Sequence, residues 1–391
     1  MHLGKYVFSQ IVEFIPRKIF YNSINRYKGN ERIRNLSCRD QFLALMFGQL
    51  ANLPSLRSIV VCLNAHANSL YHLGFKLNKF QLSTLARANE NRDWRIYHDL
   101  TMSLIITARQ LYVNDNDFKL DLKGSVYALD STVIDLCLNT FKWAYFELGK
   151  SAVKIHTQLD LKGNIPAFFW ITKAKKHDIN FLDILEFEAG AFYIMDRGYI
   201  DFERLYKINE QKAYFIIRPK DSLSFKRMYS QVVDKPTGVR CDQIIKLKQF
   251  YSKKRYPEKL RRIKYYDQET KRYYIYLTNN FEQSPQTIAD LYRHRWKIEL
   301  FFKWIKQHLH IEVFWGYTSN AVKIQIYAAM SSFLIVAIMK KRLKSNRNIY
   351  EILQILGVSL FEKTPINTIL SESYLQNENN HEKNQLRLFD F

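Results

Sequence analysis

Three acidic residues occupy sequence contexts that suit phosphoryl transfer. Asp130 follows the apolar run VYAL and Asp196 follows FYIM, so we expect each carboxylate at the end of a buried strand, while Glu299 lies on a later helical stretch. Burying an aspartate there costs several kcal/mol unless a cation or hydrogen-bond donor compensates it. Either aspartate alone is more typical of a turn cap. Together, three such carboxylates can hold two Mg²⁺ ions about 3.5–4 Å apart, one activating the attacking oxygen and one stabilising the leaving oxygen.

A strongly basic segment, LYRHRWKIELFFKWIKQ (291–307), surrounds Glu299. At about 100° per residue, four of its polar residues share a helix face about 60° wide beside an apolar stripe: Tyr292, Arg295, Glu299 and Lys306. A solvated charged face held by ion pairs four residues apart would explain the Lys and Glu. It would not explain the tyrosine on the same line.

A mixed sheet is expected to position the two aspartates. Apolar runs predict strands at 125–130, 152–160, 165–172, 191–196 and 213–218. Helical spacing predicts helices at 179–188 and 201–211. This order of elements indicates an α/β core whose sheet begins antiparallel and continues parallel. The Glu299 helix is expected to begin with Ser284 as N-cap and Pro285 at its first position, and to run to about Leu309.

The flanking regions show helical spacing. Helices are expected at 41–66, with a break at Pro54, and at 93–113. Between them, 80–92 predicts a short helix with a Ser/Thr/Arg/Asn-rich face, which fits a DNA-reading helix of a helix-turn-helix and an ordinary connecting helix about equally well. The apolar segment 324–339 is shorter than a membrane span and is expected to form a buried core helix.

The charge balance points to a polyanionic partner. The chain has 59 Lys+Arg against 37 Asp+Glu, a formal net charge of +22, and the basic segment KKRYPEKLRRIK is bordered by tyrosines. Cations bind phosphates and aromatic rings stack on bases. Their combination here favours a segment that contacts DNA over an ordinary solvated loop. The residues expected to contact DNA in this way are Lys253, Lys254, Arg255, Arg261, Arg262, Arg293 and Lys297.

Several other classes of protein are disfavoured. Four scattered cysteines without a C-x-x-C pair fit a reducing cytoplasm, and no signal peptide or membrane span is expected. The sequence has neither a Gly-rich phosphate loop nor a G-x-S-x-G elbow, so no nucleotide cofactor is expected. His177, beside Asp178, is expected to cap the following helix rather than bind a metal.

The spacing Tyr292-x2-Arg295-x3-Glu299-x6-Lys306 resembles the YREK signature of the DDE transposases of bacterial insertion sequences. DRGYIDF, which begins at Asp196, resembles the family's D-x-G-[YF] segment, and AKKHD (174–178) resembles its A-x-x-H-D stretch. The separation of Asp196 from Glu299 suits the branch of the family that carries a β-rich insertion between these residues.

The resemblance implies an RNase H-like mixed α/β core in which Asp130, Asp196 and Glu299 are catalytic and bind two Mg²⁺ ions, with Mn²⁺ able to substitute. Tyr292, Arg295 and Lys306 would hold phosphates near the cleaved end. The implied reaction nicks the transposon end, releases a 3′-OH that attacks through a hairpin, and finally joins target DNA. The protein would act as a homodimer that bridges two terminal inverted repeats in a bacterial cytoplasm, on the nucleoid.

The domain organisation expected on this basis has six parts: a helical N-terminal DNA-binding region (1–120), the first part of the core (121–219), the β-rich insertion (220–283), the Glu-bearing core helix (284–315), a C-terminal helical region for dimerisation (316–372) and a polar, disordered tail (373–391). Relatives stack a flipped base on a Trp of the insertion. This insertion has no Trp, so a tyrosine is the candidate substitute: Tyr265, Tyr266, Tyr273 or Tyr274.

Two other functions fit the same residues. An RNase H-like endonuclease or resolvase would cut DNA without joining it, and an inactive transposase derivative would act as a DNA-binding repressor. The intact triad argues against the repressor, and the net charge argues against a two-carboxylate glycosidase.

Overall fold

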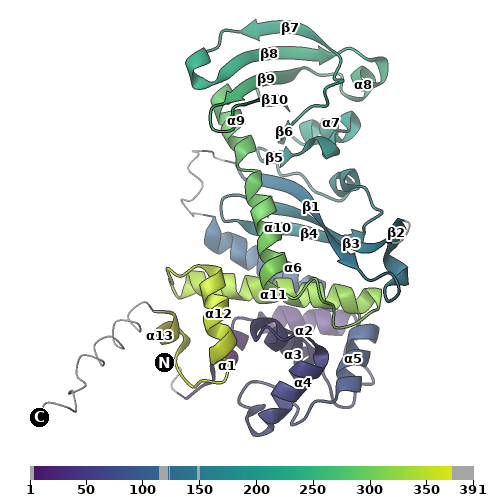
Figure 1. The fold of residues 1–391 in the computed structure, drawn as a ribbon, viewed down its shortest axis with the longest axis vertical. Helices are drawn as coiled ribbons and strands as arrows, with labels where there is room; N and C mark the ends of the chain where they lie inside the picture. The colour runs from purple at the N-terminus through teal and green to yellow at the C-terminus, as the bar shows by residue number, and fades with distance from the viewer. Residues whose placement is uncertain (1–3, 114–121, 123, 148–149, 372–391) are drawn as a thin grey trace, which may run out of the picture. The chain divides into compact units, whose positions relative to one another are not determined.

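The computed structural model describes residues 4–113, 122, 124–147 and 150–371, which fall into two compact units (Figure 1). The first unit joins Met1–Leu111 to Lys306–Phe391, and the second comprises Tyr112–Ile305. The tail expected to be disordered lies outside the described residues.

The second unit is built on a ten-stranded sheet. Its strands are β1 (Val126–Leu136), β2 (Tyr145–Glu147), β3 (Lys150–Asp160), β4 (Ile165–Lys173), β5 (Phe192–Met195), β6 (Tyr214–Ile217), β7 (Phe225–Gln231), β8 (Val239–Leu247), β9 (Leu260–Asp267) and β10 (Arg272–Thr278). In its core the order is β4-β3-β1-β5-β6, with β3 antiparallel to β1 and β4, and with β5 and β6 parallel to β1. This is the expected RNase H-like arrangement.

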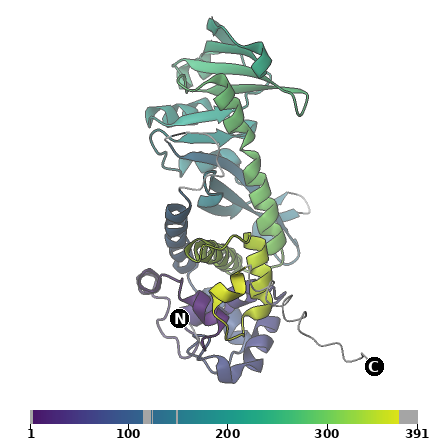
Figure 2. The same cartoon turned by 90° about the vertical axis from the view of Figure 1, so that its left-hand side faces the viewer.

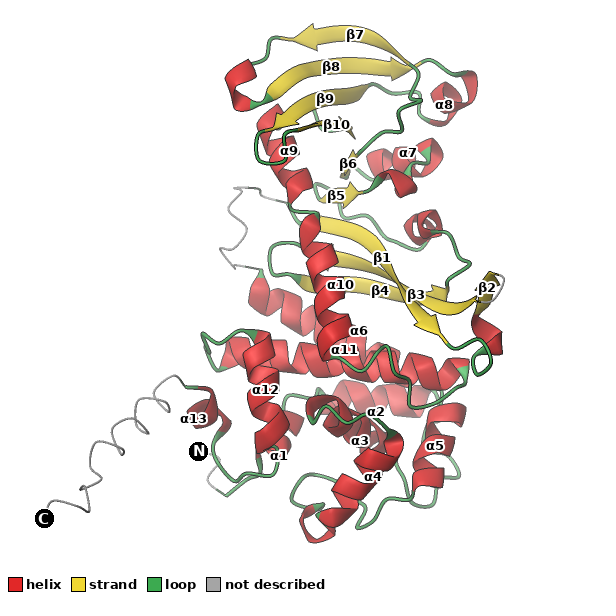
Figure 3. Ribbon diagram, viewed as in Figure 1, coloured by secondary structure: helices red, strands yellow, loops and turns green. Residues whose placement is uncertain are grey.

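The β-rich insertion continues the same sheet. Strand β10 pairs antiparallel with β6, and the order then runs β10-β9-β8-β7 (Figure 3). The short helix α8 (Phe250–Arg255) lies between β8 and β9 in the chain. The sequence predicted the β-rich character of the insertion, but neither β7 nor α8.

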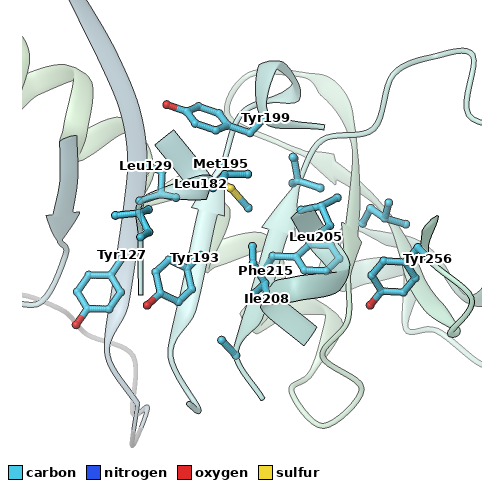
Figure 4. Close-up of a cluster of buried hydrophobic side chains, with 14 of the residues drawn as sticks. Tyr127, Leu129, Leu182, Tyr193, Met195, Tyr199, Leu205, Ile208, Phe215 and Tyr256 are labelled. Atoms are coloured by element: carbon cyan, nitrogen blue, oxygen red, sulfur yellow. The ribbon is translucent and has the colours of Figure 1, made fainter. Parts of the chain in front are cut away.

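An apolar cluster covers one face of the core strands (Figure 4). Tyr127 and Leu129 of β1, Tyr193 and Met195 of β5, and Leu205 of helix α7 (Phe202–Glu210) all belong to it. Because successive strand side chains point to opposite faces, Asp130, the residue after Leu129, points to the other face of the sheet.

The single helix expected from Ser284 to Leu309 is two helices, α9 (Pro285–Arg293) and α10 (Trp296–His308). Ser284 is the N-cap, as predicted, and accepts a hydrogen bond from the Thr287 N–H. Around Arg295 the backbone bonds join residues three apart, from Arg295 N–H to Tyr292 O and from Ile298 N–H to Arg295 O. This tighter turn interrupts the single regular helix on which the common face of Tyr292 and Glu299 was predicted.

Two other expectations about local structure are corrected. The strand predicted to end at Asp130 continues to Leu136, because β3 pairs with it along that length. The helix predicted at 179–188 is only a 3₁₀ turn, Asp178–Asp183, and His177 makes no side-chain cap to it.

The described part of the first unit is helical. Its helices are α1 (Val7–Val12), α2 (Arg17–Arg26), α3 (Cys38–Leu50), α4 (Leu56–Ala65), α5 (Leu82–Asn91), α6 (Arg95–Tyr112, which ends one residue into the second unit), α11 (Ser319–Arg342), α12 (Ile349–Ser359) and α13 (Ile366–Leu370). Residues 66–81 separate α4 from α5, far more than the short turn of a helix-turn-helix, so α5 is not the second helix of such a motif with α4.

Helix α11 forms the core of this unit, as predicted for 324–339, and Figure 2 shows it nearly end-on. Among the described helices it alone has the length and apolar composition to cross a membrane, and 94% of its most apolar window is buried inside the structure. Burial of that kind is what a core helix requires.

Candidate active site

The register of β1 and β5 brings Asp130 and Asp196 side by side. The parallel pairing runs from Val126 opposite Phe192 to Leu129 opposite Met195, where β5 ends. Asp130 and Asp196 are therefore the next pair in register, on strands that lie about 4.8 Å apart. Asp196 remains extended (φ −81°, ψ 175°) and its Oδ1 accepts a hydrogen bond from the Gly198 N–H at 2.9 Å.

Arg295 joins Asp130 to the third carboxylate. Its Nη1 lies 3.2 Å from Asp130 Oδ2, and its Nη2 lies 2.5 Å from Glu299 Oε1. Glu299 is on the first turn of α10, four residues after Arg295. The Arg295 side chain is only 18% exposed, so its guanidinium is a partly desolvated cation between two acids that the sequence assigns to the same site.

The environment of Asp130 favours its neutral form. Burial raises the pKa of Asp130 to about 6, and the nearby charges of Asp196 and Glu299 add to the rise. The Ser131 N–H, 2.8 Å from Asp130 Oδ1, and the Arg295 guanidinium oppose the rise in pKa without cancelling it. Burial, more than neighbouring negative charge, is therefore the cause of the raised pKa of Asp130.

The carboxylates of Asp130, Asp196 and Glu299 have the donor atoms that a hard divalent cation prefers. Three carboxylates supply the oxygen ligands that Mg²⁺ prefers, and Arg295 acts as a stand-in cation between two of them. The buried Tyr199 Oη and Arg295 Nε, close to the acids, have no hydrogen-bond partner among the described residues. No group of three or more His, Cys, Asp or Glu in the described part of the chain is close enough to hold a metal ion as it stands. As the structure stands, Arg295 lies between Asp130 and Glu299.

The remaining signature residues lie along the same pair of helices. Tyr292, at the end of α9, is 9% exposed, with its ring 4.9 Å from that of Tyr276 and 5.9 Å from the Arg295 guanidinium carbon. Burial raises the pKa of Tyr292, so its hydroxyl is neutral at physiological pH. Lys306 lies about two turns beyond Glu299, in the last turn of α10, and belongs to the first unit.

The basic residues of the insertion differ in their surroundings. Lys253, Lys254 and Arg255 are all exposed on α8. Arg262 is half-buried, with Nη1 3.1 Å from Gln243 Oε1. Arg261 is 2% exposed and pairs through two nitrogens with Asp242, at 2.7 and 2.9 Å. The expectation that Arg261 contacts DNA is corrected, because its guanidinium is buried and fully paired.

Outside the insertion, Arg293 is exposed on α9, with ion pairs of 3.7 and 3.8 Å to Asp290 and Asp267. Lys297 is half-buried on the first turn of α10. Arg293 therefore shares the exposure of the three cations of α8 but has acidic partners, whereas Lys297 is less exposed than they are.

A polar cluster next to Asp130 was missed by the sequence analysis. Ser131 Oγ donates to Asp178 Oδ1 at 2.6 Å, and Lys154 Nζ forms an ion pair with the same oxygen at 3.0 Å. The fully buried His156 has its Nδ1 3.5 Å from it. The A-x-x-H-D stretch was the available signal, but it was assigned to a helix cap by His177 instead of to Asp178.

The ionisation of this cluster follows from its contacts. Burial alone would raise the pKa of Asp178, but hydrogen bonds from Ser131 and Lys154 outweigh it and hold that pKa below its ordinary value. Burial lowers the pKa of His156 to about 4, so its ring is neutral. The ion pair between Asp178 and Lys154 and the hydrogen bond from Ser131 therefore hold in place the strand segment that carries Asp130.

The RNase H-like sheet with these carboxylates defines a class of nucleic-acid enzymes, and comparison with known proteins gives the family. The family described as "Transposase DDE domain" matches residues 121–335, more than half of the chain. The chain therefore belongs to the DDE transposases of insertion sequence elements. Proteins of this family act on DNA and use divalent metal ions. A domain of unknown function, DUF4372, also matches residues 3–76.

Individual relatives agree with this assignment. The chain is 31% identical over 291 residues to transposase y4zB of Sinorhizobium fredii, covering 73% of this chain and 79% of that protein. It is 28% identical over 279 residues to a probable transposase for insertion sequence element IS5377 of Geobacillus stearothermophilus, covering 70% and 71%. Among solved structures, a chain of the piggyBac transposase synaptic complex with hairpin DNA gives a TM-score of 0.45 at 10% identity, covering 96% of this chain and 84% of that one.

Proposed function

We propose that this transposase binds the terminal inverted repeats of its element, cleaves DNA at the ends and joins the 3′-OH ends to target DNA by two-metal-ion phosphoryl transfer. The observation that carries the proposal is the pairing of β1 with β5, which ends where Asp130 and Asp196 become neighbours, with Glu299 linked to Asp130 through Arg295.

In this proposal Asp130, Asp196 and Glu299 hold two Mg²⁺ ions, and Mn²⁺ can replace them. When bound, such ions supply an activated attacking oxygen and a stabilised leaving oxygen. Arg295 exchanges its carboxylate partners for a phosphate of the DNA end, for which its fork of N–H donors is suited. Tyr292 orients that guanidinium, and Lys306 holds a neighbouring phosphate.

DNA contacts outside the active site come from exposed cations. The α8 helix carries Lys253, Lys254 and Arg255 next to Phe250 and Tyr251, whose side chains are each 75% exposed. Exposed aromatic rings beside cations are suited to binding distorted or single-stranded DNA, because the rings can stack on unpaired bases. Arg262, Arg293 and Lys297 add general attraction to the DNA backbone.

The wider organisation is proposed as follows. Region 1–120 binds DNA, region 316–372 dimerises, and a homodimer bridges two transposon ends. No nucleotide cofactor takes part, because the 3′-OH attacks an existing phosphodiester. The protein works in the bacterial cytoplasm, on the nucleoid.

The test uses oligonucleotides ending in the terminal repeat, either intact or pre-cut, with a plasmid target and Mg²⁺. Asp130→Asn, Asp196→Asn and Glu299→Gln are each expected to reduce both cleavage and joining to background while leaving DNA binding intact. Asp135→Asn is the matched control, because Asp135 is an exposed acid on the same strand as Asp130.

The outcomes separate the competing functions. Joining of pre-cut ends by the wild type supports the transposase. Cleavage without joining supports an RNase H-like endonuclease or resolvase, and specific binding without either reaction supports an inactive repressor. Unchanged cleavage in the three triad variants would show that the site is assigned to the wrong residues.

A further inference from the structure

Tyr199 lies at the edge of the apolar cluster of the core, next to the carboxylates of the candidate site. Its side chain is 1% exposed and belongs to the cluster that covers the core strands. Figure 4 shows its ring above Leu129 and Met195, the residues that directly precede Asp130 and Asp196. The ring of this tyrosine is therefore placed where β1 and β5 deliver the two aspartates.

The backbone of Tyr199 is fixed to Asp196. The Tyr199 N–H donates to Asp196 O at 3.2 Å, within the 3₁₀ turn Arg197–Tyr199, and the Gly198 N–H donates to Asp196 Oδ1 at 2.9 Å. A Cβ at Gly198 would lie only 3.0 Å from the same carboxylate oxygen, so glycine allows the turn to lie this close to it. Local bonds thus set the position of the tyrosine relative to a proposed metal ligand.

The Tyr199 hydroxyl is buried and has no hydrogen-bond partner among the described residues. A phenylalanine would fill nearly the same space without burying an unsatisfied polar group, which costs free energy. Because buried polar groups in proteins are nearly always paired, this hydroxyl points to a partner that becomes available when the site changes state.

Three carboxylates lie close enough to Tyr199 to act on its hydroxyl. Burial raises the pKa of Tyr199 well above its ordinary value, and the charges of Asp130, Asp178 and Asp196 raise it further. The hydroxyl therefore keeps its proton at physiological pH and is a hydrogen-bond donor surrounded by acceptors.

Among these three acids, Asp130 is the one that stands to lose a donor. Its Oδ2 is bonded to Arg295, which the proposed function transfers to a phosphate of the DNA. Asp178 Oδ1 and Asp196 Oδ1 would keep their own donors in that event. Asp130 would then be a mostly buried carboxylate with one oxygen in need of a donor.

We propose that Tyr199 is a positioning residue of the carboxylate site, whose hydroxyl donates to Asp130 once DNA or a metal ion has drawn Arg295 away from that carboxylate. The bond would hold the carboxylate in one orientation, as hydrogen bonds to metal-ligating carboxylates do. The inference rests on the proposed function, because it takes Asp130 as a metal ligand.

The test compares Tyr199→Phe, which removes only the hydroxyl, with Tyr256→Phe. Tyr256 is a matched control, because it is also 1% exposed, belongs to the same apolar cluster and has no hydrogen-bond partner for its hydroxyl among the described residues. The acid that acts on the pKa of Tyr256 is Glu258, which is outside the triad.

Electron paramagnetic resonance of free Mn²⁺ measures the metal affinity of the full chain without DNA. Tyr199→Phe is expected to weaken Mn²⁺ binding by about tenfold, and Tyr256→Phe by less than about twofold. In an Asp178→Asn background, Tyr199→Phe should still weaken it by about tenfold. Loss of the effect in that background would assign the hydroxyl to Asp178 and overturn the inference.

Stability separates positioning from packing. Urea denaturation in EDTA is expected to show Tyr199→Phe at least as stable as the wild type, because the hydroxyl has no partner before the metal binds. A Tyr199→Phe protein that is less stable in EDTA and keeps its Mn²⁺ affinity has lost only packing, and that result overturns the inference. Equal Mn²⁺ affinity in the two phenylalanine variants does the same.

Failure of the inference and failure of the proposed function look different, because Mn²⁺ binding is measured without DNA. If Tyr199→Phe alone weakens Mn²⁺ binding but the wild type neither cleaves nor joins DNA, the proposed function is wrong and the role of Tyr199 stands. If the wild type cleaves and joins DNA while Tyr199→Phe matches its Mn²⁺ affinity, the role of Tyr199 is wrong and the proposed function stands.

Discussion

Arg295 and Glu299, four residues apart, are joined by a 2.5 Å contact, and the same guanidinium reaches Asp130 from its other nitrogen. A residue of the phosphate-binding signature thus occupies the space between two of the proposed metal ligands. At the proposed site a metal ion would therefore compete with Arg295 for the same carboxylate oxygens.

Arg295→Gln is expected to bind Mn²⁺ at least about tenfold more tightly than the wild type in the absence of DNA. Unit charges about 5 Å apart interact by about 3 kcal/mol at an effective dielectric of about 20, so removing the cation removes a repulsion that opposes the metal. Electron paramagnetic resonance of free Mn²⁺ measures the affinity without any reaction. Arg293→Gln, which removes a charge paired with Asp267 and Asp290, is the control. Equal Mn²⁺ affinity in Arg295→Gln and the wild type would contradict the competition.

Asp130→Asn is expected to stabilise the metal-free protein at pH 7.5 by about 2 kcal/mol. The folded pKa of about 6 lies above the ordinary value of 3.8, so ionising the buried carboxylate costs stability. The cost is absent below about pH 4, grows as pH rises to about 6 and is constant above that. Urea denaturation in EDTA at pH 7.5 and at pH 4 measures it, and the difference between the proteins should disappear at the lower pH. A less stable Asn variant at pH 7.5 would show that the Arg295 contact outweighs the burial of the charge.

Asp178→Ala is expected to lower the free energy of unfolding by about 2 kcal/mol, because it leaves the mostly buried Lys154 without its ion-pair partner. It should also raise the metal concentration needed for half-maximal cleavage, since Ser131 beside Asp130 loses its acceptor. Asp183→Ala breaks a more exposed pair with Arg204 and should cost less than about 1 kcal/mol. Chemical denaturation and a metal titration measure the two effects, and a result in which both variants behave alike would count against a positioning role for Asp178.

Arg261→Ala is expected to destabilise the protein by about 3–5 kcal/mol, because it leaves Asp242 as an unpaired buried charge. Lys254→Ala should leave stability unchanged and weaken DNA binding, because Lys254 is exposed on α8. Denaturation and DNA-binding measurements on both variants separate a residue that maintains the fold from one that contacts DNA. A fully stable Arg261→Ala protein with weakened DNA binding would restore Arg261 to the contact surface.

The sequence predicted the order and type of the core strands because each is a short apolar run with turn residues around it. Its main errors lie where tertiary pairing decides the outcome. Strand β1 extends past Asp130 because β3 pairs with it to Leu136. Arg261 meets Asp242 because β8 and β9 pair in one particular register, which no local pattern encodes.

The carboxylate triad could be proposed from spacing and family resemblance, whereas its internal contacts could not. The break between α9 and α10 contains neither Pro nor Gly, so no residue type in the sequence predicts it. Asp178 was visible only as part of a motif. Its partners Ser131 and Lys154 lie on strands whose register brings them together across the sheet.

The direct pairing of β10 with β6 makes the insertion part of the same hydrogen-bonded sheet as β1, the strand that carries Asp130. Neighbouring strands are spaced by about 4.8 Å, so β1 and β8, which are five strand intervals apart, are separated by about 24 Å along the sheet. That length equals about seven nucleotide steps at 3.4 Å each. Under the proposed function, DNA bound on the insertion would therefore lie a fixed number of bases from the proposed metal site.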